Sequence, residues 1–170
     1  RRRYAEDLPH FENTGRGELR ELLMCALRYT TWLRFYDPII GKVTRRELGA
    51  WRDGLGFVLE CWREATRCAS RRESAVEIVT KFPAGGGAPA EVAGRIQDAL
   101  VAPLQSEFGV DFAEPRLKQD HHGKFHARHL QTESLPIHFD RSFDLFETRG
   151  PKRGELRRQI VTLDKLRWNT

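Results

Sequence analysis

The stretch TTWLRFYDPIIG, residues 30–41, decides the fold class. Its β-branched and aromatic residues predict a strand over Trp32–Tyr36, which Pro38 and Gly41 bring to an end. A second apolar run, AVEIVT at 75–80, is typical of a short strand buried in a parallel sheet.

Helical patterns separate these strands. Apolar residues recur at i, i+3 and i+4 from Glu18, which predicts a first helix. The TRRE segment at 44–47 has the form of a capping box and predicts the start of a long second helix. A third helix is expected from Pro89 to a stop at Gly109, with a kink at Pro103. The order predicts an α/β fold with a mainly parallel sheet, an antiparallel C-terminal hairpin and helices on both faces.

The 170 residues, of which 39% are hydrophobic, suit one globular domain. We expect an irregular leader over 1–17, the folded domain over 18–148, and a basic C-terminal helix or tail over 149–170. No apolar run is long enough to cross a bilayer. Because the chain begins with Arg1 instead of Met, we expect a part of a larger protein.

Cysteine usage favours a reducing compartment. The three cysteines are Cys25, Cys61 and Cys68, of which the first two lie in segments of helical pattern. We expect buried free thiols, and the cytoplasm is the expected location. No metal-type cysteine spacing is present in the sequence, and no cofactor is expected.

Positive charge gathers in the C-terminal segment. The net charge is +5, and the basic residues from Arg149 to Arg167 far outnumber the acids there, Glu155 and Asp164. This pattern predicts a surface that faces phosphates of a nucleic acid or of an anionic membrane. The alternative is a solvated helical face without a ligand.

The histidine-rich stretch is the most distinctive part of the chain. GKFHARHLQ at 123–131 predicts a strand, and LPIHFD at 135–140 its hairpin partner. Strand alternation then puts Lys124, His126 and Arg128 on one face, where an imidazole beside a guanidinium suits a phosphate. Two alternatives compete with this interpretation: a zinc site, which needs more ligands than alternation brings together, and a basic strand without a ligand.

These segments also resemble a known family. His126-Ala127-Arg128, followed by a hairpin and by RSFDLF at 141–146, is similar to the end of the phospholipase D-like domain of the MIT C-terminal type. The strands at 32–36 and 75–80 and the helix order agree with that family over about 18–148. The chain departs from its pattern at Ala127, where the family has Asp, and at Ser142, where it has Gly.

The resemblance implies phosphodiester chemistry. The superfamily motif is His-x-Lys-x4-Asp, in which one His attacks phosphorus and a second His protonates the leaving oxygen. The corresponding residues are His126, Arg128 and Glu133, and they are the implied catalytic residues. Lys124, Arg128 and Arg141 are the implied phosphate ligands. Because the chain has one such motif, catalysis implies a homodimer that shares one site. The alternative is that His121, His122 or His138 supplies the second histidine from the same chain.

We therefore expect a phosphodiesterase that acts on nucleic acid. The alternative is a non-catalytic module that binds a phosphorylated partner or an anionic lipid surface, or that serves as a protein-interaction domain of a larger regulatory or defence protein.

Overall fold

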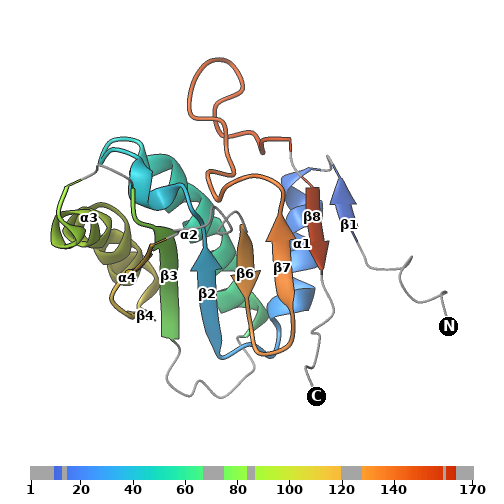
Figure 1. Ribbon diagram of the computed structural model, residues 1–170. Coiled ribbons are helices and arrows are strands. Elements are labelled where there is room, and N and C mark those ends of the chain that lie inside the picture. Colours follow the sequence, from blue (N-terminus) through green and yellow to red (C-terminus); the bar gives the residue numbers. More distant parts are fainter. Residues whose placement is uncertain are drawn as a thin grey trace, which may run out of the picture.

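The computed structural model describes residues 10–12, 15–66, 75–83, 87–119, 128–158 and 160–163 (Figure 1). The elements follow one another as β1 (His10–Glu12), α1 (Arg16–Leu27), β2 (Trp32–Tyr36), the 3-10 turn η1 (Ile40–Lys42), α2 (Leu48–Ala65), β3 (Ala75–Lys81), α3 (Pro89–Ile96), the π-helical turn η2 (Gln97–Val101), α4 (Ala102–Phe108), β4 (Asp111–Phe112), β5 (Arg116–Lys118), β6 (His129–Gln131), β7 (Pro136–Phe139) and β8 (Ile160–Leu163).

The described strands form one mixed sheet in the order β1-β8-β7-β6-β2-β3-β4, and β5 also pairs with β3. The pairings of β3 with β2, β4 and β5 are parallel, and the remaining pairings are antiparallel. The β6–β7 hairpin closes at Thr132, whose hydroxyl accepts from the backbone N–H of Leu135 at 3.1 Å. The predicted α/β fold with an antiparallel hairpin is therefore confirmed.

Strand β2 shows how the sequence pattern becomes a two-sided sheet. Leu33 and Phe35 are buried, whereas Trp32, Arg34 and Tyr36 are only partly buried. Successive side chains of a strand point to opposite faces, so one face of β2 packs into the core and the other does not.

The helices lie on one face of the sheet. Figure 1 shows α1 and α2 behind the strands, with α3 and α4 beside them, and buried residues of these helices and of the strands form one hydrophobic cluster. The prediction of helices on both faces is wrong for the described part of the chain. Right-handed crossovers explain the difference: β2, β3 and β4 follow one another in a single direction across the sheet, so successive crossovers cover the same face.

The predicted helix boundaries have visible physical causes. Glu47 accepts from the Thr44 backbone N–H at 2.8 Å, and the Glu47 N–H donates to the Thr44 hydroxyl at 3.4 Å, so the capping box ahead of α2 is confirmed. Pro103 has no N–H, and the turn before it widens into the π-helical η2, where the Ala102 N–H donates to the carbonyl of Gln97.

Both ends of the described chain differ from expectation. The leader was expected to be irregular, yet His10–Glu12 forms β1. The basic tail contains no helix in its described residues; instead Ile160–Leu163 forms β8, which pairs with β1 on one side and β7 on the other. The C-terminal segment is thus an interior part of the sheet.

The thiols are also unlike each other. Cys61 is buried, and burial raises the pKa of its thiol to about 11, whereas Cys25 is exposed. The prediction that Cys25 is buried is wrong, because it lies on the solvent side of α1.

Candidate functional site

Polar residues converge at the edge of the sheet where β2 ends. Tyr36 pairs with His129, so the end of β2 lies beside the start of β6. The Phe139 N–H at the end of β7 donates to the carbonyl of Arg128 at 2.9 Å. At this one edge, β2 is followed by Asp37, β7 is followed by Asp140, and β6 is preceded by Arg128. Ligand sites of open α/β sheets form at the carboxyl ends of parallel strands, and this is such an edge.

A buried carboxylate, Asp37, organises this edge. Its Oδ1 accepts from the Ile39 N–H at 2.9 Å, and its Oδ2 accepts from Trp51 Nε1 at 2.9 Å. The same Oδ2 accepts from the hydroxyl of Ser142 and, at 3.1 Å, from the Phe143 N–H. Asp37 is completely buried, so these donors replace the water that a carboxylate otherwise needs.

Asp37 thereby ties the segment after β7 to β2 and α2. Phe143 is completely buried, and its ring packs edge-on against Phe35 at a centroid distance of 5.1 Å. Gly54 of α2 touches the same segment so closely that a Cβ there would lie 1.7 Å from the Phe143 carbonyl oxygen. The backbone that carries Arg141 and Ser142 is thus held from two sides.

A hollow of about 360 Å³ opens at this edge. It is lined by Arg128, Asp140, Arg141, Ser142, Asp144 and Arg157. We call it the arginine hollow. Arg128 Nη1 donates to the Asp140 carbonyl at 3.0 Å, which fixes its guanidinium. A guanidinium held in this way has further N–H groups that can donate to a phosphate oxygen.

Arg157 has a structural role in the wall of the hollow. Its Nη1 lies 2.6 Å from Asp144 Oδ2, and its Nε donates to the Phe146 carbonyl at 3.0 Å. Burial raises the pKa of the Asp144 carboxyl, and the neighbouring Arg157 opposes that rise. Arg128 and Arg141 are therefore the cations of the hollow that remain for a ligand.

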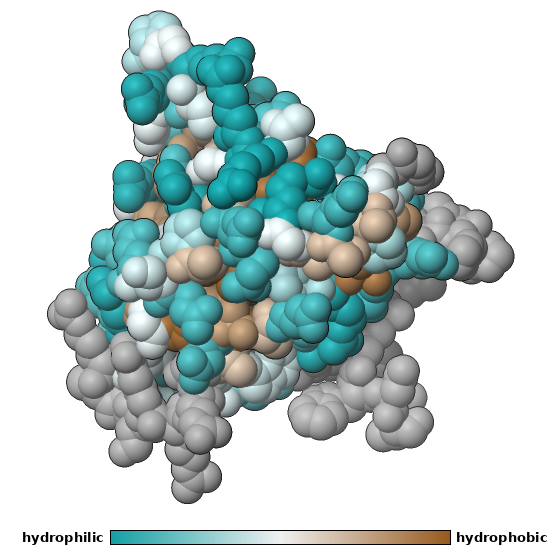
Figure 2. All heavy atoms as spheres, turned by 90° about the vertical axis from the view of Figure 1, so that its left-hand side faces the viewer, coloured by the Kyte–Doolittle hydropathy of each residue, from teal (hydrophilic) through white to brown (hydrophobic). Residues whose placement is uncertain are grey.

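A basic loop projects from the same edge. It begins and ends at the Phe146–Leu156 bridge, and the Glu147 N–H donates to the Glu155 carbonyl at 2.9 Å. Arg149, Lys152 and Arg153 are exposed on it. The loop stands at the top of Figure 1, and the same projection in Figure 2 is hydrophilic. We call this segment, 147–155, the basic loop.

Some predicted site residues come together and others do not. Arg128 and Arg141 both line the arginine hollow. Glu133 lies beyond the other end of β6, in the hairpin turn, where it accepts from the Thr31 N–H at 2.8 Å. His126 and Lys124 lie outside the described residues.

Sequence reasoning missed Asp37 and Arg157. The only local signal for Asp37 is its place directly after a predicted strand and before Pro38. Its hydrogen-bond partners Trp51 and Ser142 are 14 and 105 residues away along the chain, so no residue close to Asp37 in the sequence indicates them.

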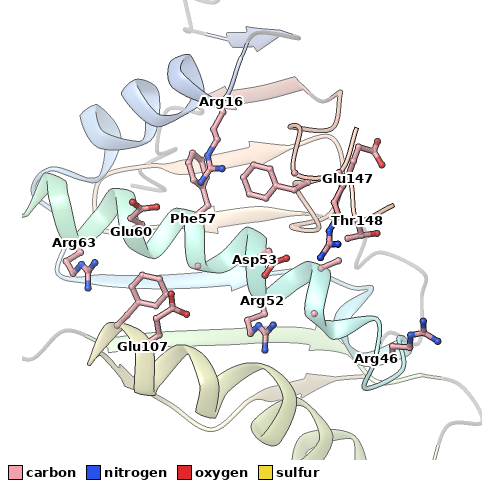
Figure 3. A pocket seen from close by; sticks show the side chains of 17 residues that line it. Arg16, Arg46, Arg52, Asp53, Phe57, Glu60, Arg63, Glu107, Glu147 and Thr148 are labelled. Carbon is pink, nitrogen blue, oxygen red and sulfur yellow. The ribbon is translucent and has the colours of Figure 1, made fainter. Parts of the chain in front are cut away.

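A second and larger hollow, of about 720 Å³, runs along the outer face of α2 (Figure 3). Two of its arginines pack on aromatic rings: the guanidinium of Arg16 lies about 5 Å from the ring centroids of Phe57 and Phe146, and that of Arg63 lies 5.4 Å from Phe108. Acidic residues alternate with them, namely Asp53, Glu60, Glu107 and Glu147. We take the arginine hollow as the candidate site because it lies at the carboxyl end of β2 and contains Arg128 and Arg141, the two described residues that the sequence predicts as phosphate ligands.

The described residues contain neither a metal-type cluster nor a membrane-spanning helix. No three His, Cys, Asp or Glu side chains converge there in a way that could hold a metal ion. No helix among them combines the length and apolarity needed to span a membrane.

Comparisons with known proteins assign no family. No protein-family model matches the sequence, and no curated protein matches it. The structure is similar to that of TrmBL2, an archaeal chromatin protein described as showing a novel mode of DNA binding, at 10% identity and a TM-score of 0.33. The similarity covers 95% of this chain and 48% of that one, so this chain spans about half the length of that protein. A likeness this weak carries no argument, and the phospholipase D-like label stays a prediction.

Proposed function

We propose that this chain binds the phosphate backbone of a nucleic acid at the sheet edge formed by the arginine hollow and the basic loop. The observation that carries the proposal is the convergence of Arg128 and Arg141 on one hollow. Two guanidinium groups at one hollow can donate to the oxygens of one phosphate.

The basic loop supports a polymeric ligand over a single phosphate. Arg149, Lys152 and Arg153 add exposed positive charge at the edge that also holds the hollow. A chain of phosphates can contact both sets of cations at once, and each contact releases counterions from the nucleic acid. We therefore expect affinity to fall steeply as salt concentration rises.

We propose the phosphodiesterase reaction with two of the three implied catalytic residues. His126 is the nucleophile that the resemblance implies, and Arg128, two residues further along the chain, holds the phosphate. Glu133 is left out of this proposal because β6 separates it from Arg128. At about 3.3 Å per strand residue, the two ends of that segment are more than 10 Å apart, which excludes direct contact between Glu133 and a phosphate held by Arg128.

The test is a titration of a labelled oligonucleotide followed by fluorescence anisotropy at several salt concentrations. Arg128→Ala and Arg141→Ala should each weaken binding by about 1 to 3 kcal/mol, the range for a charge-assisted contact. Arg28→Ala is the matched control, because Arg28 is an exposed arginine after α1, at the opposite edge of the sheet.

The basic loop is tested by replacing Arg149, Lys152 and Arg153 together with Gln. Loss of up to three phosphate contacts should lower the slope of log affinity against log salt by about 1 per contact. Deleting the whole C-terminal segment is a poorer test, because it also removes β8 from the sheet. Equal affinity of Arg128→Ala and wild type would remove the arginine hollow from the interface. Binding to vesicles of anionic lipid in preference to the oligonucleotide would replace the nucleic acid with a membrane surface.

A further inference from the structure

Helix α1 presents a set of exposed side chains on the side away from the core. Glu21, Met24, Cys25 and Arg28 follow one another at i, i+3, i+4 and i+7, a spacing that puts them on one side of a helix. Arg28 comes directly after α1 but keeps helical dihedral angles, so it continues that side. Glu21, Cys25 and Arg28 are exposed, and Met24 is half-buried. We call these four residues the α1 face.

A hollow of about 810 Å³ extends from the α1 face to the end of α2. Tyr29, Glu64 and Ala65 also line it. Tyr29 is 81% exposed, and it stands beside the half-buried Met24 in this lining. Tyr and Met are enriched where one protein contacts another, so the composition of the hollow suits a protein partner.

The charges of the α1 face make it complementary to itself. Glu21 lies at one end, Arg28 lies at the other, and Met24 and Cys25 lie midway between them. Among the described residues neither Glu21 nor Arg28 forms an ion pair, whereas Glu64 is paired with Arg20. If a second α1 runs antiparallel across a twofold axis between positions 24 and 25, Glu21 of each copy meets Arg28 of the other.

We propose that a second copy of this chain docks on the α1 face, through an antiparallel contact between the two α1 helices. One contact then forms two ion pairs and brings the apolar residues of both copies together at the axis. The face carries one charge of each sign, so it favours neither a polyanion nor a polycation over a second copy. One helix face is a small interface, and the dimer should therefore be weak, with a Kd of about 10 to 100 µM.

This dimer is separate from the proposed function. The α1 face and Tyr29 precede the start of β2, whereas the arginine hollow lies where β2 ends. The contact therefore does not join two arginine hollows into the shared site that phosphodiester cleavage implies. For the same reason, Arg28→Ala still serves as a control for the phosphate contact.

The experiment exchanges the charges and measures the dimer by sedimentation velocity over about 1 to 500 µM, a range that brackets the expected Kd. Glu21→Arg should weaken the dimer at least about 10-fold, because it turns both ion pairs into like-charge contacts, and Arg28→Glu should do the same. The double variant Glu21→Arg/Arg28→Glu should restore the wild-type affinity. Asp53→Arg is the matched control, since Asp53 is an exposed acid on α2 outside the α1 face.

Cys25 gives a second readout because it lies next to the proposed axis and is exposed, whereas Cys61 is buried. In a Cys68→Ser chain, a bismaleimide that spans about 8 to 10 Å, the distance between packed helix axes, should link the Cys25 thiols of two copies. A chain that stays monomeric over the whole range, or a double variant as weak as the single ones, would overturn the inference. So would a yield of linked dimer that is equal in wild type and Glu21→Arg.

Discussion

Replacing Gly54 with Ala tests how the sheet edge is held in place. A Cβ at Gly54 would lie 1.7 Å from the carbonyl oxygen of Phe143 and 3.2 Å from Cγ of Leu145. Ordinary contact distances are about 3.5 Å, so the backbone at Phe143 has to move by roughly 1.5 to 2 Å. Gly54 is buried in the middle of α2, so the added methyl has nowhere else to go.

The expected loss of stability follows from what that movement breaks. The Phe143 N–H and the Ser142 hydroxyl both donate to the buried carboxylate of Asp37. Hydrogen bonds to charged groups contribute about 1.5 to 3 kcal/mol each, and a helical Gly→Ala change returns about 1 kcal/mol. The free energy of unfolding should therefore fall by about 2 to 5 kcal/mol.

Gly49→Ala is the matched control on the same helix. No heavy atom lies within 4 Å of a Cβ built at Gly49. This variant should be unchanged or up to about 1 kcal/mol more stable, because alanine favours the helix. Opposite signs for the same chemical change in one helix isolate the contact with Phe143 from helix propensity.

Urea unfolding followed by far-UV circular dichroism measures both variants. Gly54→Ala should lower the midpoint strongly, and it should also weaken phosphate binding, because Arg141 lies two residues before Phe143. A Gly54→Ala protein within about 1 kcal/mol of wild type would refute the reasoning, since the segment would then have room that the structure denies it.

Three further predictions concern single side chains. Burial, with the nearby His138 and Lys118, lowers the pKa of His129 from 6.5 to about 4, so the unfolded chain takes up the proton first as pH falls. The contribution of His129 to the free energy of unfolding should be intact above pH 6.5 and should decline toward pH 4 by up to about 3 kcal/mol, as measured by urea unfolding. His129→Gln should flatten that decline. Asp37→Asn should lower the free energy of unfolding by about 2 to 4 kcal/mol, because the N–H₂ group of the new asparagine would face the donors Trp51 Nε1 and the Phe143 N–H. Asp53→Asn, at an exposed position, should change it little in the same assay. If the chain cleaves phosphodiesters, His126→Ala should abolish cleavage and the active species should sediment as a homodimer; activity that survives His126→Ala would rule out the implied nucleophile.

The local parts of the fold could be predicted because their causes are local. The strand at Trp32–Tyr36, the capping box at Thr44 and the hairpin after β6 each depend on residues a few positions apart. The side of the sheet that the helices cover depends on the direction in which the crossovers proceed, which no single segment encodes. That is why helices on both faces were expected and one layer is found.

The residues of the candidate site also fall into those that could be predicted from the sequence and those that could not. Arg128 and Arg141 were predicted as phosphate ligands from short motifs, and they lie at one hollow. Glu133 was grouped with Arg128 by motif spacing, but a strand between them sends the two residues to opposite ends of β6. Spacing along the chain identifies neighbours only where the intervening backbone turns, and here it is extended.

The pairing of β1 with β8 has a consequence for the order of folding. Among the described strands β1 pairs only with β8, which is the last of them in sequence order. During synthesis the segment His10–Glu12 emerges before most of the sheet, but its partner strand forms only after Ile160–Leu163 has emerged as well. Contacts between such distant segments form late because closing a long loop costs entropy. We therefore expect amide protons of these two strands to become protected together and after those of the other strands, so that their protection marks the completion of the sheet.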